Sequence, residues 1–354
     1  MERPMIKIIV LTAAAVLACG AVLAEGDYFG AEFCAECHPQ QYNDWKVSGH
    51  PYKLRSSEIA RNLPLPLPEG YTWDDISYVI GGHGWKARYM DRDGYIITSI
   101  KTPDGEVPGH NQYNLATGRW VDYHPGEVKP YDCGRCHTTG FDPEGHQDGL
   151  EGIIGTWALP GIQCEACHGP GYEMAVDRSA AMCGQCHSRG DLDTIPAKGG
   201  FIRHHEQYNE LLASPHAGFG CVTCHDPHKK AEFSIVKDCA TCHEEEAADY
   251  EGTRMQIAGV TCTDCHMPAA SKSAEALGPH AGDVKTHLFR INTDANASMF
   301  TEDGAFVKLD ENGQGAVTID FACMNCHRGV DPEVLAREAE NFHQRPHRVL
   351  ALVP

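Results

Sequence analysis

Cys221-Val222-Thr223-Cys224-His225 is one of eight Cys-x-x-Cys-His motifs in this chain of 354 residues. With 17 Cys and 21 His, random order would give roughly 0.05 such motifs, so the pattern carries chemistry. Two thiols three residues apart can form thioether bonds to one haem, and the adjacent imidazole then binds the iron as the proximal ligand. The sequence therefore predicts eight covalently bound c-type haems.

The motifs use sixteen of the seventeen cysteines, and the remaining one is Cys19. A disulfide scaffold and paired zinc sites are both excluded, because His follows every second Cys of a pair. The predicted covalent attachment residues are Cys34, Cys37, Cys133, Cys136, Cys164, Cys167, Cys183, Cys186, Cys221, Cys224, Cys239, Cys242, Cys262, Cys265, Cys323 and Cys326. The predicted proximal iron ligands are His38, His137, His168, His187, His225, His243, His266 and His327.

The N-terminal residues have the pattern of an export signal. Basic residues precede an uncharged run that ends near Ala24, which predicts a signal peptide over residues 1–24. Val16-Leu17-Ala18-Cys19 also resembles a lipoprotein cleavage site, so a lipid anchor at Cys19 is the alternative. Export predicts a periplasmic protein or one at the outer cell surface or outside the cell.

Charge and composition narrow the partners and the fold class. The chain has 49 acidic against 29 basic side chains, which disfavours nucleic acid and leaves redox proteins or extracellular acceptors as expected partners. Eight haems in so short a chain predict a mainly irregular fold, with short α-helices packed around a row of haems and small β-hairpin insertions. The expected segments after the signal are residues 25–70 with haem 1, a β-rich haem-free insertion at 71–124, haems 2–4 at 125–190, haems 5–7 at 191–292, and a β-hairpin with haem 8 and a helix at 293–354.

Thirteen histidines lie outside the motifs, more than the eight irons need. Every iron could therefore be bis-histidine, six-coordinate and low-spin, which suits electron transfer. His228 is too close to His225 to turn back onto the same iron, so it would bind a neighbouring haem. His83, among glycines, is typical of a turn. The candidate distal ligands are His50, His124, His146, His205, His216, His228, His280, His287 and His343.

Several motifs with their flanks carry a family resemblance. They are Cys34-Ala35-Glu36-Cys37-His38-Pro39 with Ser48-Gly49-His50, Gly161-Ile162-Gln163-Cys164-Glu165-Ala166-Cys167-His168-Gly169-Pro170-Gly171, Cys221-Val222-Thr223-Cys224-His225-Asp226-Pro227-His228 and Gly259-Val260-Thr261-Cys262-Thr263-Asp264-Cys265-His266-Met267-Pro268. They resemble the multihaem cytochrome c superfamily, which includes the cytochrome c-554 family, pentahaem nitrite reductases and octahaem hydroxylamine oxidoreductases. The resemblance favours five of the distal candidates: His50, His205, His216, His228 and His287.

Two departures from the resemblance bear on function. No Lys follows a Cys pair, so the Cys-x-x-Cys-Lys marker of a catalytic haem in the nitrite reductases is absent. Gly171-Tyr172-Glu173-Met174 has Met where relatives commonly place a distal His, which makes Met174 a further candidate ligand.

Three functions follow from these patterns. The leading hypothesis is an exported octahaem cytochrome that passes single electrons along closely spaced haems and is not an enzyme. One alternative is a subunit that self-assembles into an extracellular cytochrome filament. The other is an octahaem reductase of nitrogen or sulfur oxyanions, which would need a five-coordinate haem with a polar pocket, for which Arg88, Tyr89 and Arg254 are weak candidates.

Overall fold

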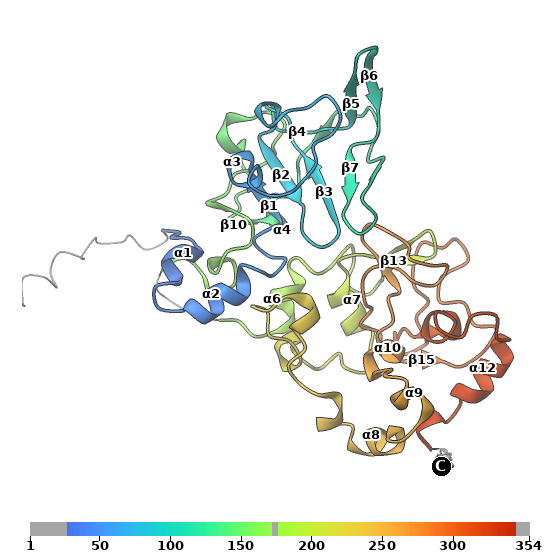
Figure 1. Cartoon of the computed structure of the whole chain (residues 1–354). Coiled ribbons are helices and arrows are strands. Elements are labelled where there is room, and N and C mark those ends of the chain that lie inside the picture. The colour runs from blue at the N-terminus through green and yellow to red at the C-terminus, as the bar shows by residue number, and fades with distance from the viewer. Residues whose placement is uncertain (1–26, 172–175, 345–354) are drawn as a thin grey trace, which may run out of the picture.

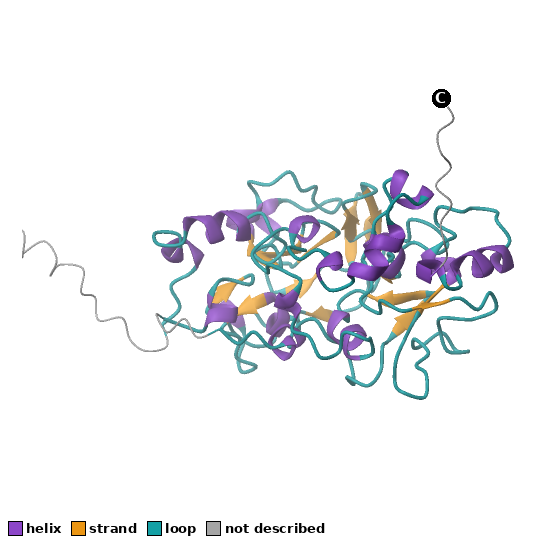
Figure 2. Cartoon of the chain, turned by 90° about the horizontal axis from the view of Figure 1, so that it is seen from below, coloured by secondary structure: helices purple, strands orange, loops and turns teal. Residues whose placement is uncertain are grey.

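The computed structural model describes residues 27–171 and 176–344. The predicted signal peptide, Cys19 and Met174 lie outside these residues. Figure 1 shows strands β1–β7 gathered in one part of the molecule, while the helices from α6 onward lie among long loops in the rest. Seen from below, loops dominate and the strands are short (Figure 2).

The largest sheet has five antiparallel strands in the order β1-β2-β3-β7-β8. Its strands are β1 (Leu54–Ser56), β2 (Tyr78–Gly81), β3 (Lys86–Tyr89), β7 (Gln112–Asn114) and β8 (Arg119–Val121). Beside it, β4 (Tyr95–Ile96) pairs with β9 (Lys129–Pro130), and β5 (Ser99–Thr102) forms a hairpin with β6 (Gly105–Pro108). The β-rich region therefore begins at Leu54, earlier than the expected residue 71.

Within the expected β-rich insertion, residues 85–90 and 95–100 form only part of a hairpin. The turn forms, with Gly94 at a positive φ of 87°, but a single bridge between Met90 and Ile96 joins the two arms. Strand β3 pairs instead with β2 and β7. The alternation of buried and half-buried side chains in β3 suits a central strand, which a local turn pattern could not reveal.

Two side-chain clusters pack against this sheet. One contains Leu54, Tyr78, Met90, Tyr131 and Trp157, and the other contains Ile76, Val79, Ala87, Tyr89 and Ile97 along with further residues. Alternate residues of a strand face opposite sides of the sheet, which places Tyr78 and Val79 in different clusters. This part of the molecule has a conventional apolar core.

The helices are short, as the sequence predicts, and the longest one described, α12 (Pro332–Ala339), has 8 residues. The α-helices before it are α1 (Ala31–Cys34), α2 (Pro39–Trp45), α3 (Ser57–Ala60), α4 (Gly134–His137), α5 (Glu165–His168), α6 (Ala180–Gly184), α7 (Gln207–Leu212), α8 (Glu244–Tyr250), α9 (Arg254–Ile257), α10 (Cys262–His266) and α11 (Ile319–Ala322). Single 3₁₀ turns are η1 (Trp73–Asp75), η2 (Gln147–Gly149), η3 (Cys221–Thr223), η4 (Ala231–Phe233), η5 (Cys239–Thr241) and η6 (Phe342–Gln344).

Small two- and three-stranded sheets join the loops of the second half. The strands β12 (Ala197–Lys198), β13 (Phe201–Arg203) and β14 (Ser271–Lys272) form one sheet, and β15 (Ile291–Asn292) pairs with β16 (Val317–Thr318). Before them, β10 (Thr138–Thr139) pairs with β11 (Leu159–Pro160). One apolar cluster, which includes Phe201, Ile202, Leu288 and Phe321, holds this half together. In the described ranges, 27–171 and 176–344, no helix is long and apolar enough to cross a bilayer.

Candidate haem-binding site

Most Cys-x-x-Cys-His motifs fold into a single helical turn. The backbone N–H of His168 donates to the carbonyl of Cys164 at 3.0 Å, and His225 and Cys221 make the same bond at 3.0 Å. Residues i, i+3 and i+4 of a helical turn share one face. The turn therefore brings the two sulfur atoms and the imidazole of a motif to the same side, where one haem can take all three.

Four motif imidazoles face a histidine from elsewhere in the chain. An imidazole nitrogen binds a first-row metal ion at about 2.0–2.1 Å, and its ring centre lies about 1.1 Å behind it, so two imidazoles on one metal have centres about 6.2 Å apart. The observed ring-centre distances are 6.2 Å for His168–His228, 6.0 Å for His225–His287, 5.9 Å for His216–His243 and 6.1 Å for His266–His343. Each ring-centre distance therefore matches that of two imidazoles sharing one iron.

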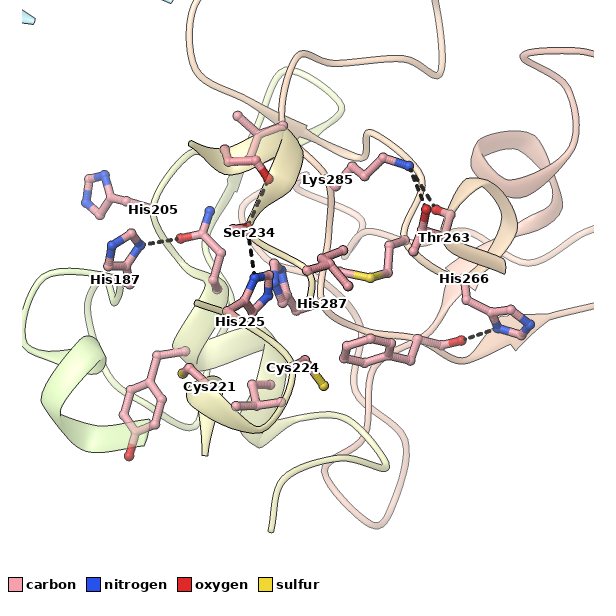
Figure 3. Close-up of a pocket in the computed structure, with 18 of the residues that line it drawn as sticks. His187, His205, Cys221, Cys224, His225, Ser234, Thr263, His266, Lys285 and His287 are labelled. Carbon is pink, nitrogen blue, oxygen red and sulfur yellow. Dashed lines mark hydrogen bonds between the residues drawn. The ribbon is translucent and has the colours of Figure 1, made fainter. Parts of the chain in front are cut away.

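Hydrogen bonds fix the orientation of several motif imidazoles. His225 Nδ1 lies 3.0 Å from Ser234 Oγ, His266 Nδ1 lies 2.7 Å from the Phe289 carbonyl, and His187 Nδ1 lies 3.2 Å from Gln207 Oε1 (Figure 3). With Nδ1 engaged, the other nitrogen is free to bind a metal. Burial lowers the pKa of His287 to about 3 and also lowers the pKa of His225. Both rings are therefore neutral, the form that binds iron.

A continuous cavity of about 3190 Å³ connects most of the motifs. Cysteines or histidines of motifs 2 and 4–8 line it, together with Cys167 of motif 3. Pockets for a single small ligand measure about 300–1,000 Å³. The cavity is therefore large enough for a row of cofactors, and its donor set of paired thiols with facing imidazoles fits covalently bound haem.

Contacts between motif thiols give the order of the sites, which we number by motif. The thiols of Cys34 and Cys164 lie close enough to shift each other's pKa, as do those of Cys136 and Cys186. A third such contact joins Cys183 to Cys221. These contacts place site 1 beside site 3, site 2 beside site 4, and site 4 beside site 5.

Electrostatic interactions between other motif cysteines place further sites beside one another. Cys167 lies near Cys183, Cys239 lies near both Cys224 and Cys262, and Cys265 lies near Cys326. The sites therefore follow one another as 1-3-4-5-6-7-8. Site 2 is a side branch at site 4.

Two further distal candidates lie near site 4. His50 and His205 are both close enough to His187 for its charge to depress their pKa values, although burial is the larger cause and brings each pKa to about 3. The Nδ1 atom of His205 lies 3.0 Å from Arg189 Nη2, and its ring is drawn beside His187 in Figure 3. His205 also lies near His137 of site 2.

The other candidate distal ligands interact with groups other than a motif imidazole. His124 Nδ1 pairs with Glu127 at 2.7 Å, His146 Nδ1 lies 2.6 Å from the Ile153 carbonyl, and His280 Nδ1 pairs with Asp320 at 3.2 Å. None of the three faces a motif imidazole among the described residues. His83 stacks on Tyr52 at 4.3 Å in the expected glycine-rich turn.

Basic side chains gather at site 2, which sequence reasoning largely missed. Lys53, Lys86 and Arg88 line the cavity, and the charge of each lowers the pKa of His137, after the larger effect of burial. Burial also lowers the pKa of Lys86 to about 7. Lys86 and Arg88 lie two residues apart on β3 and therefore on one face. The spacing of Lys86 and Arg88 along one strand is the sequence pattern that could have predicted that both side chains lie at site 2.

Of the three polar residues considered in the sequence, Arg88 alone lies at site 2. Its guanidinium carbon is 3.4 Å from the Tyr123 ring centre, and its Nε donates to Gln112 Oε1 at 2.8 Å. Tyr89 is fully buried and donates its hydroxyl to the Pro66 carbonyl. Arg254 lines another part of the cavity.

Comparisons with known proteins agree with this site. Residues 121–188 match the family described as cytochrome c7 and related cytochrome c, and residues 33–63 match cytochrome c554 and c-prime. The dissimilatory sulfite reductase MccA of Wolinella succinogenes is 22% identical over 68% of this chain and 50% of its own length. The multiheme cytochrome MtrA of Shewanella baltica is 26% identical over 41% of this chain and 47% of its own length. The chain thus spans about half the length of these two relatives.

Solved structures show the same fold. The octaheme sulfite reductase MccA has a TM-score of 0.66 at 17% identity, covering 92% of this chain and 70% of that one. The outer cell wall cytochrome OcwA has a TM-score of 0.57 at 20% identity, covering 88% and 86%. Repeated attachment motifs, facing imidazoles and these matches together show that the chain belongs to the multihaem cytochrome c superfamily.

Proposed function

We propose that this protein is an octahaem cytochrome that conducts single electrons along the path 1-3-4-5-6-7-8. The observation that carries the proposal is the set of four facing imidazole pairs, at sites 3, 5, 6 and 7. Two imidazoles per iron leave no position open to substrate and favour the low-spin state. When bound, haem supplies the one-electron chemistry, and the protein sets ligation and spacing.

The facing pairs support a proposed set of distal ligands. His228 would bind at site 3, His287 at site 5, His216 at site 6 and His343 at site 7. The pairing of His228 with His168 joins the segment after motif 5 to site 3, so one ligand would also fasten together two sites that lie on either side of site 4. His50 or His205 would serve site 4, and Met174 stays a candidate for a site that the facing pairs do not supply.

The test counts irons by coordination. Mass spectrometry of the denatured mature protein should show eight haems, and electron paramagnetic resonance should show low-spin ferric signals from sites 3, 5, 6 and 7. His228→Ala should convert one iron to a high-spin form that binds carbon monoxide after reduction. His83→Ala is the matched control, because His83 stacks on Tyr52 and faces no motif imidazole. An unchanged spectrum in His228→Ala would refute the ligand assignment.

A second candidate function is the reduction of a nitrogen or sulfur oxyanion at site 2. Lys53, Lys86 and Arg88 form a cationic wall of the cavity there, and buried charges require counter-anions. A substrate oxyanion or a haem propionate would both supply the negative charge. MccA, with the same fold, is a sulfite reductase by name.

Carbon monoxide binding and substrate turnover distinguish the reductase from a protein that only transfers electrons. One molecule of carbon monoxide bound per reduced wild-type protein, together with sulfite or nitrite reduction by a reduced viologen, would establish the reductase. Arg88→Gln should then lower turnover at least tenfold, while Arg254→Gln should leave it unchanged. Absence of both carbon monoxide binding and turnover would leave electron transfer as the sole activity.

We also propose that the protein is exported and exchanges electrons with redox proteins or extracellular acceptors. The relative OcwA is named an outer cell wall cytochrome, which supports a surface location. Fractionation of cells would locate the protein, and mass spectrometry of its N-terminus would distinguish cleavage after Ala24 from lipidation of Cys19. A filament would require head-to-tail contacts, which electron microscopy of the native protein would reveal.

A further inference from the structure

A row of buried aromatic rings leads from His137 of site 2 to the protein surface. The ring centre of Tyr131 lies 6.3 Å from that of His137 and 6.1 Å from that of Trp157. Trp157 in turn lies 5.6 Å from Tyr78. Tyr131 is 0% exposed, and Trp157 and Tyr78 are each 7% exposed.

The far end of the row has a proton acceptor. The Tyr78 hydroxyl donates to Asp148 Oδ2 at 2.5 Å, and Asp148 is exposed to solvent. Burial, followed by the contact with Asp148, raises the pKa of Tyr78, so the phenol is protonated at rest. A phenol that loses an electron must also release its proton, and Asp148 lies in hydrogen-bonding contact with that proton.

We propose that Tyr78, Trp157 and Tyr131 form a path that carries oxidising equivalents away from site 2 to the surface. When site 2 meets hydrogen peroxide, one electron leaves the Tyr78 phenol and passes through Trp157 and Tyr131 toward His137. The O–H bond of Tyr78 breaks, and the proton passes to the Asp148 carboxylate. Reduction of peroxide to two waters consumes two electrons and two protons: Tyr78 supplies one electron, a haem bound at site 2 would supply the other, and solvent supplies both protons. The Tyr78 radical, beside the exposed Asp148, can then be repaired by electron transfer from a reductant in solution.

A second aromatic row in the same half of the protein provides the control. Tyr89 lies 6.2 Å from Trp120, which lies 5.2 Å from Tyr113. No motif imidazole adjoins this row among the described residues. The Tyr89 hydroxyl donates to a backbone carbonyl, which cannot take up its proton. This row has the same ring types and a similar spacing, but it lacks both the haem end and the base.

The experiment treats the oxidised holoprotein with hydrogen peroxide and freezes it within milliseconds for electron paramagnetic resonance. Wild type should show a tyrosyl radical, which Tyr78→Phe should reduce at least fivefold and Tyr89→Phe should leave unchanged. Trp157→Phe should slow radical formation, and haem bleaching should quicken in both path variants.

Two outcomes would overturn the proposal: no radical in wild type, or equal loss of the radical in Tyr78→Phe and Tyr89→Phe. The proposal rests on haem attachment at site 2, and the haem count by mass spectrometry tests that separately. A far-ultraviolet circular dichroism spectrum checks that each variant is folded. Asp148→Asn gives a second measure, since it keeps the ring path and removes only the base, and it should also diminish the radical.

Discussion

The β-rich region and the second half of the chain are stabilised in different ways. Around the five-stranded sheet, side chains such as Ile76 and Val79 are 0% exposed and pack against one another. Near motif 5, apolar side chains such as Phe219 and Ile235 are 51% and 42% exposed and line the large cavity. The comparison teaches that the sheet is stabilised by its own side chains, whereas the second half combines one apolar cluster with a large cavity whose lining needs the cofactors.

The largest effect should come from removing a haem in the second half. In Cys221→Ala/Cys224→Ala no thioether can form at site 5, and the cavity stays partly empty. At ~24 cal/mol per Å³, a void of about 400 Å³ costs about 10 kcal/mol, which is comparable with the roughly 5–15 kcal/mol by which domains are stable. We expect no folded holoprotein, measured by the yield of haem-stained protein and by protease resistance.

Loss of the haem at site 1 should destabilise the protein less than loss of the haem at site 5. Cys34 and Cys37 do not line the large cavity, so Cys34→Ala/Cys37→Ala should yield a folded protein with one haem fewer. Equal yields of the two double variants would contradict the idea that the shared cavity makes the second half dependent on its cofactors.

A core substitution in the sheet should cost less. Ile76 is fully buried, and Ile→Ala in a core lowers the free energy of unfolding by about 2–5 kcal/mol. Ile59→Ala is the control, because Ile59 is 56% exposed, and it should have little effect. Denaturant unfolding followed by circular dichroism measures both changes. The haem spectrum of Ile76→Ala should match wild type, and a shifted spectrum would show that the sheet and the haem sites are not separable in this way.

The smallest effect should come from a helix cap in the second half. The Asp331 carboxylate accepts a hydrogen bond from the Glu333 N–H at 2.8 Å at the start of α12. Asp331→Ala should lower the free energy of unfolding by about 0.5–2 kcal/mol. Asp303→Ala, which removes a similar bond to Ala305 N in a loop, is the control for a turn outside a helix. A loss above that of Ile76→Ala would mean that α12 matters to the haem sites beyond its own stability.

The sequence shows the attachment motifs, and all four histidines that face a motif imidazole were among its candidates, but it could not pair them. His343 and His266 are far apart in the chain, yet their rings are 6.1 Å apart and nearly parallel. The basic side chains of site 2 were largely missed because they come from different elements. Lys53 lies in the loop before β1 and Lys86 lies in β3, and the two meet only after folding. The five-stranded sheet was not expected either, because β1 pairs with β2, and β3 with β7, over more than twenty residues of intervening sequence in each case.

The sequence by itself determined the covalent chemistry, since each Cys-x-x-Cys-His motif places its three groups within one helical turn. Such local geometry needs no other part of the chain. The tertiary structure alone decided which imidazoles face each other, the order 1-3-4-5-6-7-8 with site 2 as a branch, and the aromatic row from His137 to Asp148. These depend on packing between distant segments, which a one-dimensional pattern does not encode.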